Sequence, residues 1–236
     1  MGVINRGFCD VVNAGDHTYE ILGTSVPGRV DKVNQDSLGY CSDEDCLIAA
    51  IADGLGSMPL SQIGSRAVID SVFEVMAEES PGNIWKHIFE CWESSIGDEL
   101  EKYDTTCKFI CIREDKVTIG SIGDGWMGML NTDGYCELEN TNSFTNRTDS
   151  ICSPKMLEKA SILECDINDF LAFGLSTDGF SEDFDRNSRE EFLHDAYLTM
   201  SGNFSDCYFD LCSALHNWPV KTNGDDKTAI LIRKVE

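Results

Sequence analysis

The sequence predicts an α+β fold in which β-sheets are sandwiched between helical layers. Apolar runs of strand length occur near both ends of the chain and in its middle. Two amphipathic helical segments follow one another in the first half, and two more precede the last strand. Sheets and helices with one apolar face bury that face by stacking in layers. With 236 residues, 42% hydrophobic residues and no repeat or low-complexity linker, we expect a single domain over 1–236.

The first half of the chain contains strand candidates followed by a helix pair. The predicted elements are strands at 18–26 and 36–53 and helices at 61–79 and 84–103. Pro27-Gly28 marks the loop between the strands, and Pro81-Gly82 ends the first helix, for which Ser61 is the expected N-cap. Residues 1–17 are expected to be an N-terminal extension.

The second half begins with a strand meander and closes with helices and a last strand. The predicted elements are strands at 107–113, 117–122, 126–131 and 170–177, helices near 187–201 and 204–217, and a strand at 228–235. Glu114-Asp115 and Asp133-Gly134 supply turns within the meander. Residues 138–162 are polar and irregular, which indicates a flap or surface insertion.

Composition excludes several classes of function. Forty-two acidic residues against 18 basic residues give a net charge of −24, which repels nucleic acid. The chain has no apolar stretch of the roughly 20 residues that a membrane helix needs, and no secretory signal at its start. The 11 cysteines lack zinc-knuckle spacing. We therefore expect free thiols in a cytoplasmic protein with no membrane or nucleic-acid partner.

Three apolar runs end in the same dipeptide. They run into Asp53-Gly54, Asp124-Gly125 and Asp178-Gly179. An apolar strand fixes the position of its last residue, and glycine lets the backbone turn sharply. A single Asp-Gly is more often an ordinary hairpin turn. Three in series favour a site for a hard cation, which prefers oxygen ligands.

Two further carboxylates lie at the edges of apolar strands, namely Asp36 in Asn34-Gln35-Asp36 and Asp225 in the segment 224–228. Mg²⁺ and Mn²⁺ bind carboxylates and keep several waters. Two such ions about 3.5–4 Å apart activate a water and clamp a phosphoryl oxygen. The five carboxylates therefore point to metal-dependent phosphoester hydrolysis.

The order of these motifs resembles that of the metal-dependent type 2C (PPM) serine/threonine protein phosphatases, in a short bacterial-type form. The matching segments, in the family's order and over residues 20–235, are Asn34-Gln35-Asp36, Ala52-Asp53-Gly54-Leu55-Gly56, Gly64-Ser65, Ile122-Gly123-Asp124-Gly125, Ser176-Thr177-Asp178-Gly179-Phe180 and Asp225-Asp226-Lys227-Thr228. The resemblance implies an αββα sandwich, with two central and mainly antiparallel β-sheets flanked by helical layers.

The resemblance also implies a role for each carboxylate. Asp53 would bridge two Mg²⁺ or Mn²⁺ ions, and Gly54 would offer its carbonyl. Asp178 and Asp225 would complete the shell of one ion. Asp36 would orient metal-bound water, and Asp124 would help to hold a third, weaker ion. Thr177 and Thr228 are expected to support strands or ligand carboxylates.

Two positions depart from the family pattern. Asp31 stands where many members have a phosphate-binding arginine, so either Arg29 or Lys32 is expected to reach the phosphate instead. Leu55 stands where some members have a histidine that is a proposed general acid. The leaving group would then depend on water or on polarisation by metal.

The leading hypothesis is a phosphatase that hydrolyses phosphoserine or phosphothreonine on a protein through a binuclear Mg/Mn-activated water. The two departures motivate a second hypothesis, a phosphatase-shaped binding or regulatory module with weak or no activity. A third is a phosphatase of small phosphate esters.

Overall fold

The computed structural model of the chain describes residues 3–4, 7–29, 32–78, 82–138, 148–220 and 223–235. The fold consists of two six-stranded sheets with helices on their outer faces. Every strand pair within the described residues is antiparallel. The predicted α+β class and the predicted layering are therefore confirmed.

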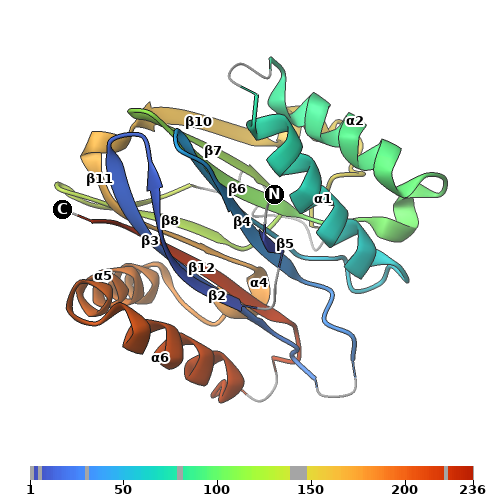
Figure 1. The fold of residues 1–236 in the computed structure, drawn as a ribbon. Helices are drawn as coiled ribbons and strands as arrows, with labels where there is room; N and C mark the ends of the chain where they lie inside the picture. Colours follow the sequence, from blue (N-terminus) through green and yellow to red (C-terminus); the bar gives the residue numbers. More distant parts are fainter. Residues whose placement is uncertain are drawn as a thin grey trace.

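Sheet A contains the strands that lead to the first two Asp-Gly pairs. In spatial order its strands are β1 (Val3–Ile4), β4 (Ser37–Ser42), β5 (Cys46–Ala52), β6 (Cys107–Arg113), β7 (Lys116–Ile122) and β10 (Ser161–Asp166). Its outer face is covered by α1 (Ser61–Met76) and α2 (Ile84–Ile96), as Figure 1 shows.

Sheet B contains the last strand of the chain in its interior. In spatial order its strands are β2 (Gly7–Ala14), β3 (His17–Val26), β12 (Lys227–Val235), β11 (Phe170–Ser176), β8 (Trp126–Asn131) and β9 (Gly134–Glu137). Its outer face is covered by α5 (Arg186–Gly202) and α6 (Phe204–His216) (Figure 1). The short elements are α3 (Met156–Lys159), α4 (Asp178–Ser181), and the 3-10 turns Leu100–Tyr103 and Ile167–Asp169.

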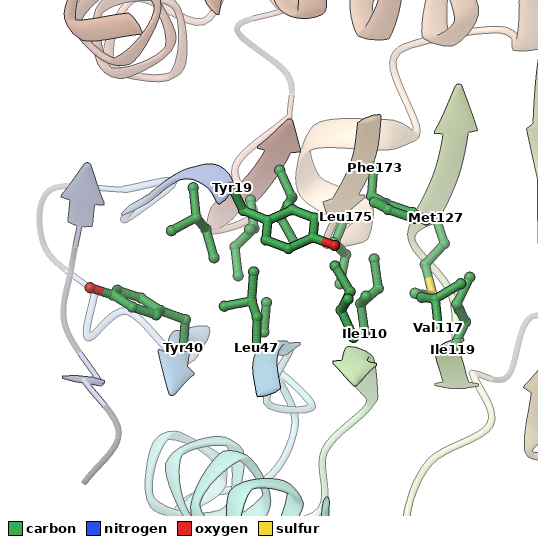
Figure 2. Close-up of a cluster of buried hydrophobic side chains, with 14 of the residues drawn as sticks. Tyr19, Tyr40, Leu47, Ile110, Val117, Ile119, Met127, Phe173 and Leu175 are labelled. Atoms are coloured by element: carbon green, nitrogen blue, oxygen red, sulfur yellow. The ribbon is translucent and has the colours of Figure 1, made fainter. Parts of the chain in front are cut away.

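The main core lies between the two sheets. Tyr19 and Phe173 of sheet B point toward Leu47 and Ile110 of sheet A (Figure 2), and all four side chains are buried. Strand β5 is apolar throughout because its two faces are both covered. Its odd-numbered residues from Leu47 contact sheet B, whereas its even-numbered residues contact the helices. The strand therefore ends at a fixed position, directly before Asp53.

The structure corrects several predicted boundaries. Residues 1–17 are not an extension, because Gly7–Ala14 form β2 and pair with β3. The segment 36–53 is a hairpin of two strands rather than one strand. The predicted helix 84–103 ends at Ile96, where Gly97 adopts a φ of 79°, and the chain resumes as a 3-10 turn. Ser61 is the first helical residue of α1, and the N-cap is Leu60.

The predicted flap at 138–162 lies only partly within the described residues. Residues 139–147 are outside them, and the remainder contains α3 and the start of β10. Strands β9 and β10 were not predicted. Both lie at sheet edges with partly exposed side chains, and so they lack the apolar run of an interior strand. Among the described helices, none has the length and apolar character that a membrane crossing requires.

Candidate active site

Asp53 follows directly after β5 and is held by two threonines. The backbone carbonyl of Asp53 accepts hydrogen bonds from Thr105 Oγ1 and from the Thr106 amide, both at 2.8 Å. The Asp53 amide in turn donates to Thr106 Oγ1 at 3.0 Å. These bonds fix the main chain on both sides of the carboxylate. The side chain therefore projects from a rigid base at the end of the strand.

Asp36 is held by Thr177 and Thr228, the two threonines expected from the sequence to support strands or ligand carboxylates. Its Oδ2 accepts hydrogen bonds from Thr228 Oγ1 at 2.6 Å and from Thr177 Oγ1 at 2.9 Å. Its other oxygen, Oδ1, is buried without a hydrogen-bond donor. Burial raises the pKa of Asp36 to about 7, although the threonine bonds act to lower it.

The predicted metal ligands converge on one cavity of about 170 Å³. Its lining residues are Lys32, Gln35, Asp53, Gly54, Leu55, Gly56, Thr106, Asp124, Thr148, Asp178, Gly224, Asp225 and Asp226. Asp36 does not line the cavity and is buried beside Asp53. The carboxylates come from ends of strands in both sheets, so the cavity lies where the two sheets meet at one edge of the sandwich.

The carboxylates raise one another's pKa. Burial, followed by the charges of Asp36 and Asp178, holds the pKa of Asp53 well above its ordinary value. Burial also raises the pKa of Asp178, and the charges of Asp124 and Asp225 add to that increase. Such a concentration of negative charge is unfavourable without a compensating cation.

The segment that carries Asp225 is braced by a buried lysine. Lys227 Nζ donates to the carbonyl of Asp225 at 2.7 Å and to Oδ1 of Asn223 at 3.3 Å. Asn223 Nδ2 reaches the carbonyl of Gly179, the residue after the ligand Asp178, at 2.9 Å. The two ligand-bearing segments are thereby tied together.

Asp226 belongs to a motif that was quoted from the sequence, but no role was predicted for it. Its Oδ1 accepts a hydrogen bond from the Gly28 amide at 2.9 Å, and its Oδ2 accepts one from the Gln35 amide at 2.7 Å. One carboxylate therefore closes both ends of the loop that carries Arg29 and Lys32. The available signal was its position beside Asp225, at the start of the last strand.

The structure separates the two candidates for contacting phosphate. Lys32 is exposed and lines the cavity. Arg29 is exposed and is not among the lining residues, but its side chain lies beside Gly224, which is one of them. Asp31, the position of the expected arginine, lies outside the described residues.

Asp124 connects the cavity to the described part of the predicted flap. Thr148 Oγ1 donates to Asp124 Oδ2 at 2.6 Å. Nearby, Ser150 Oγ donates to Oδ2 of the buried Asp104 at 2.7 Å, and the Cys152 amide donates to its Oδ1 at 3.1 Å. This segment is therefore fastened to Asp104, which directly precedes Thr105 and Thr106, the two residues that hold Asp53. None of these contacts was predicted, since they join residues distant in sequence.

The donor set fits Mg²⁺ or Mn²⁺. The cavity offers carboxylate oxygens, the buried Asp36 Oδ1 lacks a hydrogen-bond partner, and hard divalent cations prefer such oxygens. Over the described ranges, no three acidic, histidine or cysteine side chains form a ready-made ion cage. Metal binding would therefore require the carboxylate side chains to reorient around the ions.

Comparison with known proteins identifies the family. The family model for protein phosphatase 2C matches residues 28–212 of this chain. Among curated proteins, no sequence match was found.

Solved structures share the fold at low sequence identity. The structure of RsbX in complex with magnesium is 18% identical with a TM-score of 0.65, covering 97% of this chain and 100% of RsbX. Stp1 from Staphylococcus aureus is 18% identical with a TM-score of 0.69, covering 95% and 98%. The catalytic domain of PstP, in complex with two manganese ions, is 15% identical with a TM-score of 0.64, covering 92% and 99%. With the family match over most of its length, the chain belongs to the protein phosphatase 2C family of protein-serine/threonine phosphatases.

Proposed function

We propose that this chain hydrolyses phosphoserine and phosphothreonine in proteins, using two Mg²⁺ or Mn²⁺ ions held by its carboxylate cluster. The observation that carries the proposal is the convergence of Asp53, Asp124, Asp178 and Asp225 on one cavity. Each stands at the end or the beginning of a different strand. A purely structural domain has no need of so much uncompensated charge at one point.

The residues divide into roles by their position. Asp53, with Gly54 beside it in the cavity, would be shared by the two ions, and Asp178 and Asp225 would complete the set. Asp124 would hold a third ion. When bound, the ions supply charge stabilisation for the phosphoryl oxygens and lower the pKa of water.

Asp36 supports this set from inside the protein. Its hydrogen bonds to Thr177 and Thr228 fix one carboxylate oxygen, and the other, Oδ1, has no hydrogen-bond partner. We assign Asp36 the role of orienting the attacking water, as the family resemblance implies.

Substrate binding is assigned to the loop that Asp226 closes. Lys32 lines the cavity and presents an ammonium group to an anion there. Arg29, on the same loop near Gly224, is placed to contact a phosphate or an acidic group at the rim. Leu55 lines the cavity where a histidine acid would stand, so protonation of the leaving alkoxide is assigned to water.

The test is hydrolysis of p-nitrophenyl phosphate and of phosphoserine peptides in the presence of Mn²⁺. Asp53→Asn should reduce kcat/KM on the order of 100-fold or more, because a ligand carboxylate supports several kcal/mol of charge stabilisation. Asp133→Asn, in the exposed turn before β9, makes the same chemical change away from the cavity and should retain wild-type activity.

An inactive wild type, or an Asp53→Asn variant as active as wild type, would contradict the proposal. Tight binding of a phosphopeptide without turnover would instead support a binding module. Faster turnover of small phosphate esters than of any phosphopeptide would support a phosphatase of small metabolites.

A further inference from the structure

Lys108 is an unusual component of this site. It lies on β6 within an apolar strand, and its side chain is only 2% exposed. Its Nζ donates to Ser121 Oγ at 3.2 Å and to the carbonyl of Gly123 at 3.0 Å. Gly123 directly precedes Asp124. A lysine is rarely buried so completely unless acceptors or opposite charges surround it.

The surrounding charges are the carboxylates of the cavity. Burial lowers the pKa of Lys108 to about 8, and the charges of Asp124, Asp178 and Asp53 act in the opposite direction. Asp124 has the largest such effect. Around Nζ lie the Gly123 carbonyl, Ser121 Oγ and these carboxylates, which together favour the charged ammonium form.

The main chain leaves room for this side chain. A Cβ atom at Gly125 would lie 3.1 Å from Lys108 Cε and 2.5 Å from the carbonyl oxygen of Ser176. Gly125 also has a φ of 95°, which side chains other than glycine rarely adopt. The glycine after Asp124 therefore allows the lysine stem to lie close to the main chain at this point.

We propose that the Lys108 ammonium is a fixed positive charge of the metal centre, which neutralises part of the carboxylate charge and weakens the binding of an ion at Asp124. The inference rests on the proposed metal-dependent function. A cation fixed near Asp124 repels a divalent ion that approaches the same carboxylate. Asp124 Oδ2 is also engaged by Thr148 Oγ1 at 2.6 Å. Lys108 is thus a positioning residue that favours occupancy of the Asp53, Asp178 and Asp225 positions over the Asp124 position.

The experiment is calorimetric titration of metal-stripped protein with Mn²⁺ at neutral pH. Lys108→Met removes the charge at similar side-chain length and should strengthen Mn²⁺ binding on the order of tenfold, or add one ion to the stoichiometry. Lys116→Met removes an exposed charge from the neighbouring strand β7 and should bind Mn²⁺ as the wild type does. Adding Asp124→Asn to Lys108→Met should abolish the gain.

The direction of the change distinguishes the proposed role from a structural one. If Lys108 only maintained the packing of β6 and β7, its loss would loosen the site and weaken Mn²⁺ binding. A folded Lys108→Met variant with unchanged or weaker binding would therefore overturn the inference. If that variant does not fold, Lys108→Gln takes its place, because glutamine is also neutral and keeps hydrogen-bond donors. Stronger Mn²⁺ binding by Lys108→Gln would support the inference, and unchanged or weaker binding would overturn it. A wild type that binds no Mn²⁺ would instead overturn the proposed metal centre itself.

Discussion

Asp226 illustrates how one side chain connects binding and catalysis at the scale of single residues. Its carboxylate closes the loop that carries Lys32 at both ends, by accepting hydrogen bonds from the Gly28 and Gln35 amides. Its neighbour Asp225 lines the cavity as a proposed metal ligand. The segment that carries the proposed metal ligand Asp225 therefore also fixes the position of the proposed phosphate-binding loop.

We expect Asp226→Asn to raise KM for phosphoesters about tenfold, with a smaller change in kcat. An asparagine is neutral and has one acceptor oxygen, so one of the two hydrogen bonds to Gly28 and Gln35 is lost and the other is no longer charge-assisted; a bond to a charged group is worth about 1.5–3 kcal/mol. Steady-state kinetics with p-nitrophenyl phosphate at saturating Mn²⁺ measures the split between KM and kcat. Mn²⁺ affinity should stay at the wild-type value. A drop in kcat at unchanged KM would contradict this role.

The sequence predicts the acidic residues of the site better than it predicts their supports. Asp53, Asp124 and Asp178 were identifiable because each follows an apolar run, which is a local signal. Lys108 was not identified, because within a strand it reads as one isolated charge and its partners come from other strands. Contacts of this kind depend on the register between strands, which no local pattern encodes.

At the scale of elements, α1 depends on a close approach to the 3-10 turn at Leu100–Tyr103. Gly64 of α1 faces this turn, and a Cβ atom there would lie 1.7 Å from the carbonyl oxygen of Tyr103. The Gly64 carbonyl also accepts a hydrogen bond from Nε1 of the buried Trp92 at 3.0 Å, which joins α1 to α2. In the helical layer over sheet A, the backbone of α1 therefore packs directly against the backbone of the 3-10 turn.

Gly64→Ala should destabilise the protein by roughly 1–3 kcal/mol, because the added methyl group forces two backbone segments apart. Gly202→Ala, at the end of α5 where a Cβ atom meets nothing within 4 Å, is the matched control and should be neutral. Chemical denaturation monitored by circular dichroism compares the two. Equal denaturation midpoints for Gly64→Ala and wild type would show that α1 and the 3-10 turn can move apart without loss of stability.

Interior elements were predictable and edge elements were not. Strands β5 and β12 are covered on both faces, so all of β5 and residues 229–232 of β12 are apolar. Strand β10 has mostly exposed or half-exposed side chains, so its sequence reads as loop. The end of α2 at Gly97 is set by a positive φ, which the amphipathic pattern beyond it obscured.

At the scale of the whole molecule, negative charge is the main electrostatic term. The chain carries a net charge of −24, and the carboxylates of the cavity concentrate part of it inside the fold. Without metal, the native state reduces this repulsion by keeping protons on buried acids. The free energy of unfolding of the metal-free protein should therefore depend on pH.

We expect the metal-free protein to lose stability as pH rises from about 4 to about 7. Asp36 has a pKa of about 7 in the native state against an ordinary value of 3.8, so in this window the native state holds a proton that the unfolded chain has released. The free energy of unfolding then falls by up to about 1.4 kcal/mol per pH unit. Thermal melts in chelator at pH 5 and pH 7.5 measure the effect. In Asp36→Asn, which cannot ionise, this component should disappear; a wild-type melting temperature that rises over the window would contradict the linkage.

The segment from Asn223 to Thr228 has a consequence for the order of folding. It contains the proposed metal ligand Asp225, then Asp226, which closes the proposed phosphate-binding loop, and Thr228, which holds Asp36. The segment leads into β12. Strand β12 lies between β3 and β11, so sheet B stays in two halves until these late residues have been synthesised. Every partner of the segment is already present by then. The proposed hydrolytic centre is therefore completed only when β12 closes the sheet, and a nascent chain interrupted before residue 225 lacks the proposed ligand Asp225.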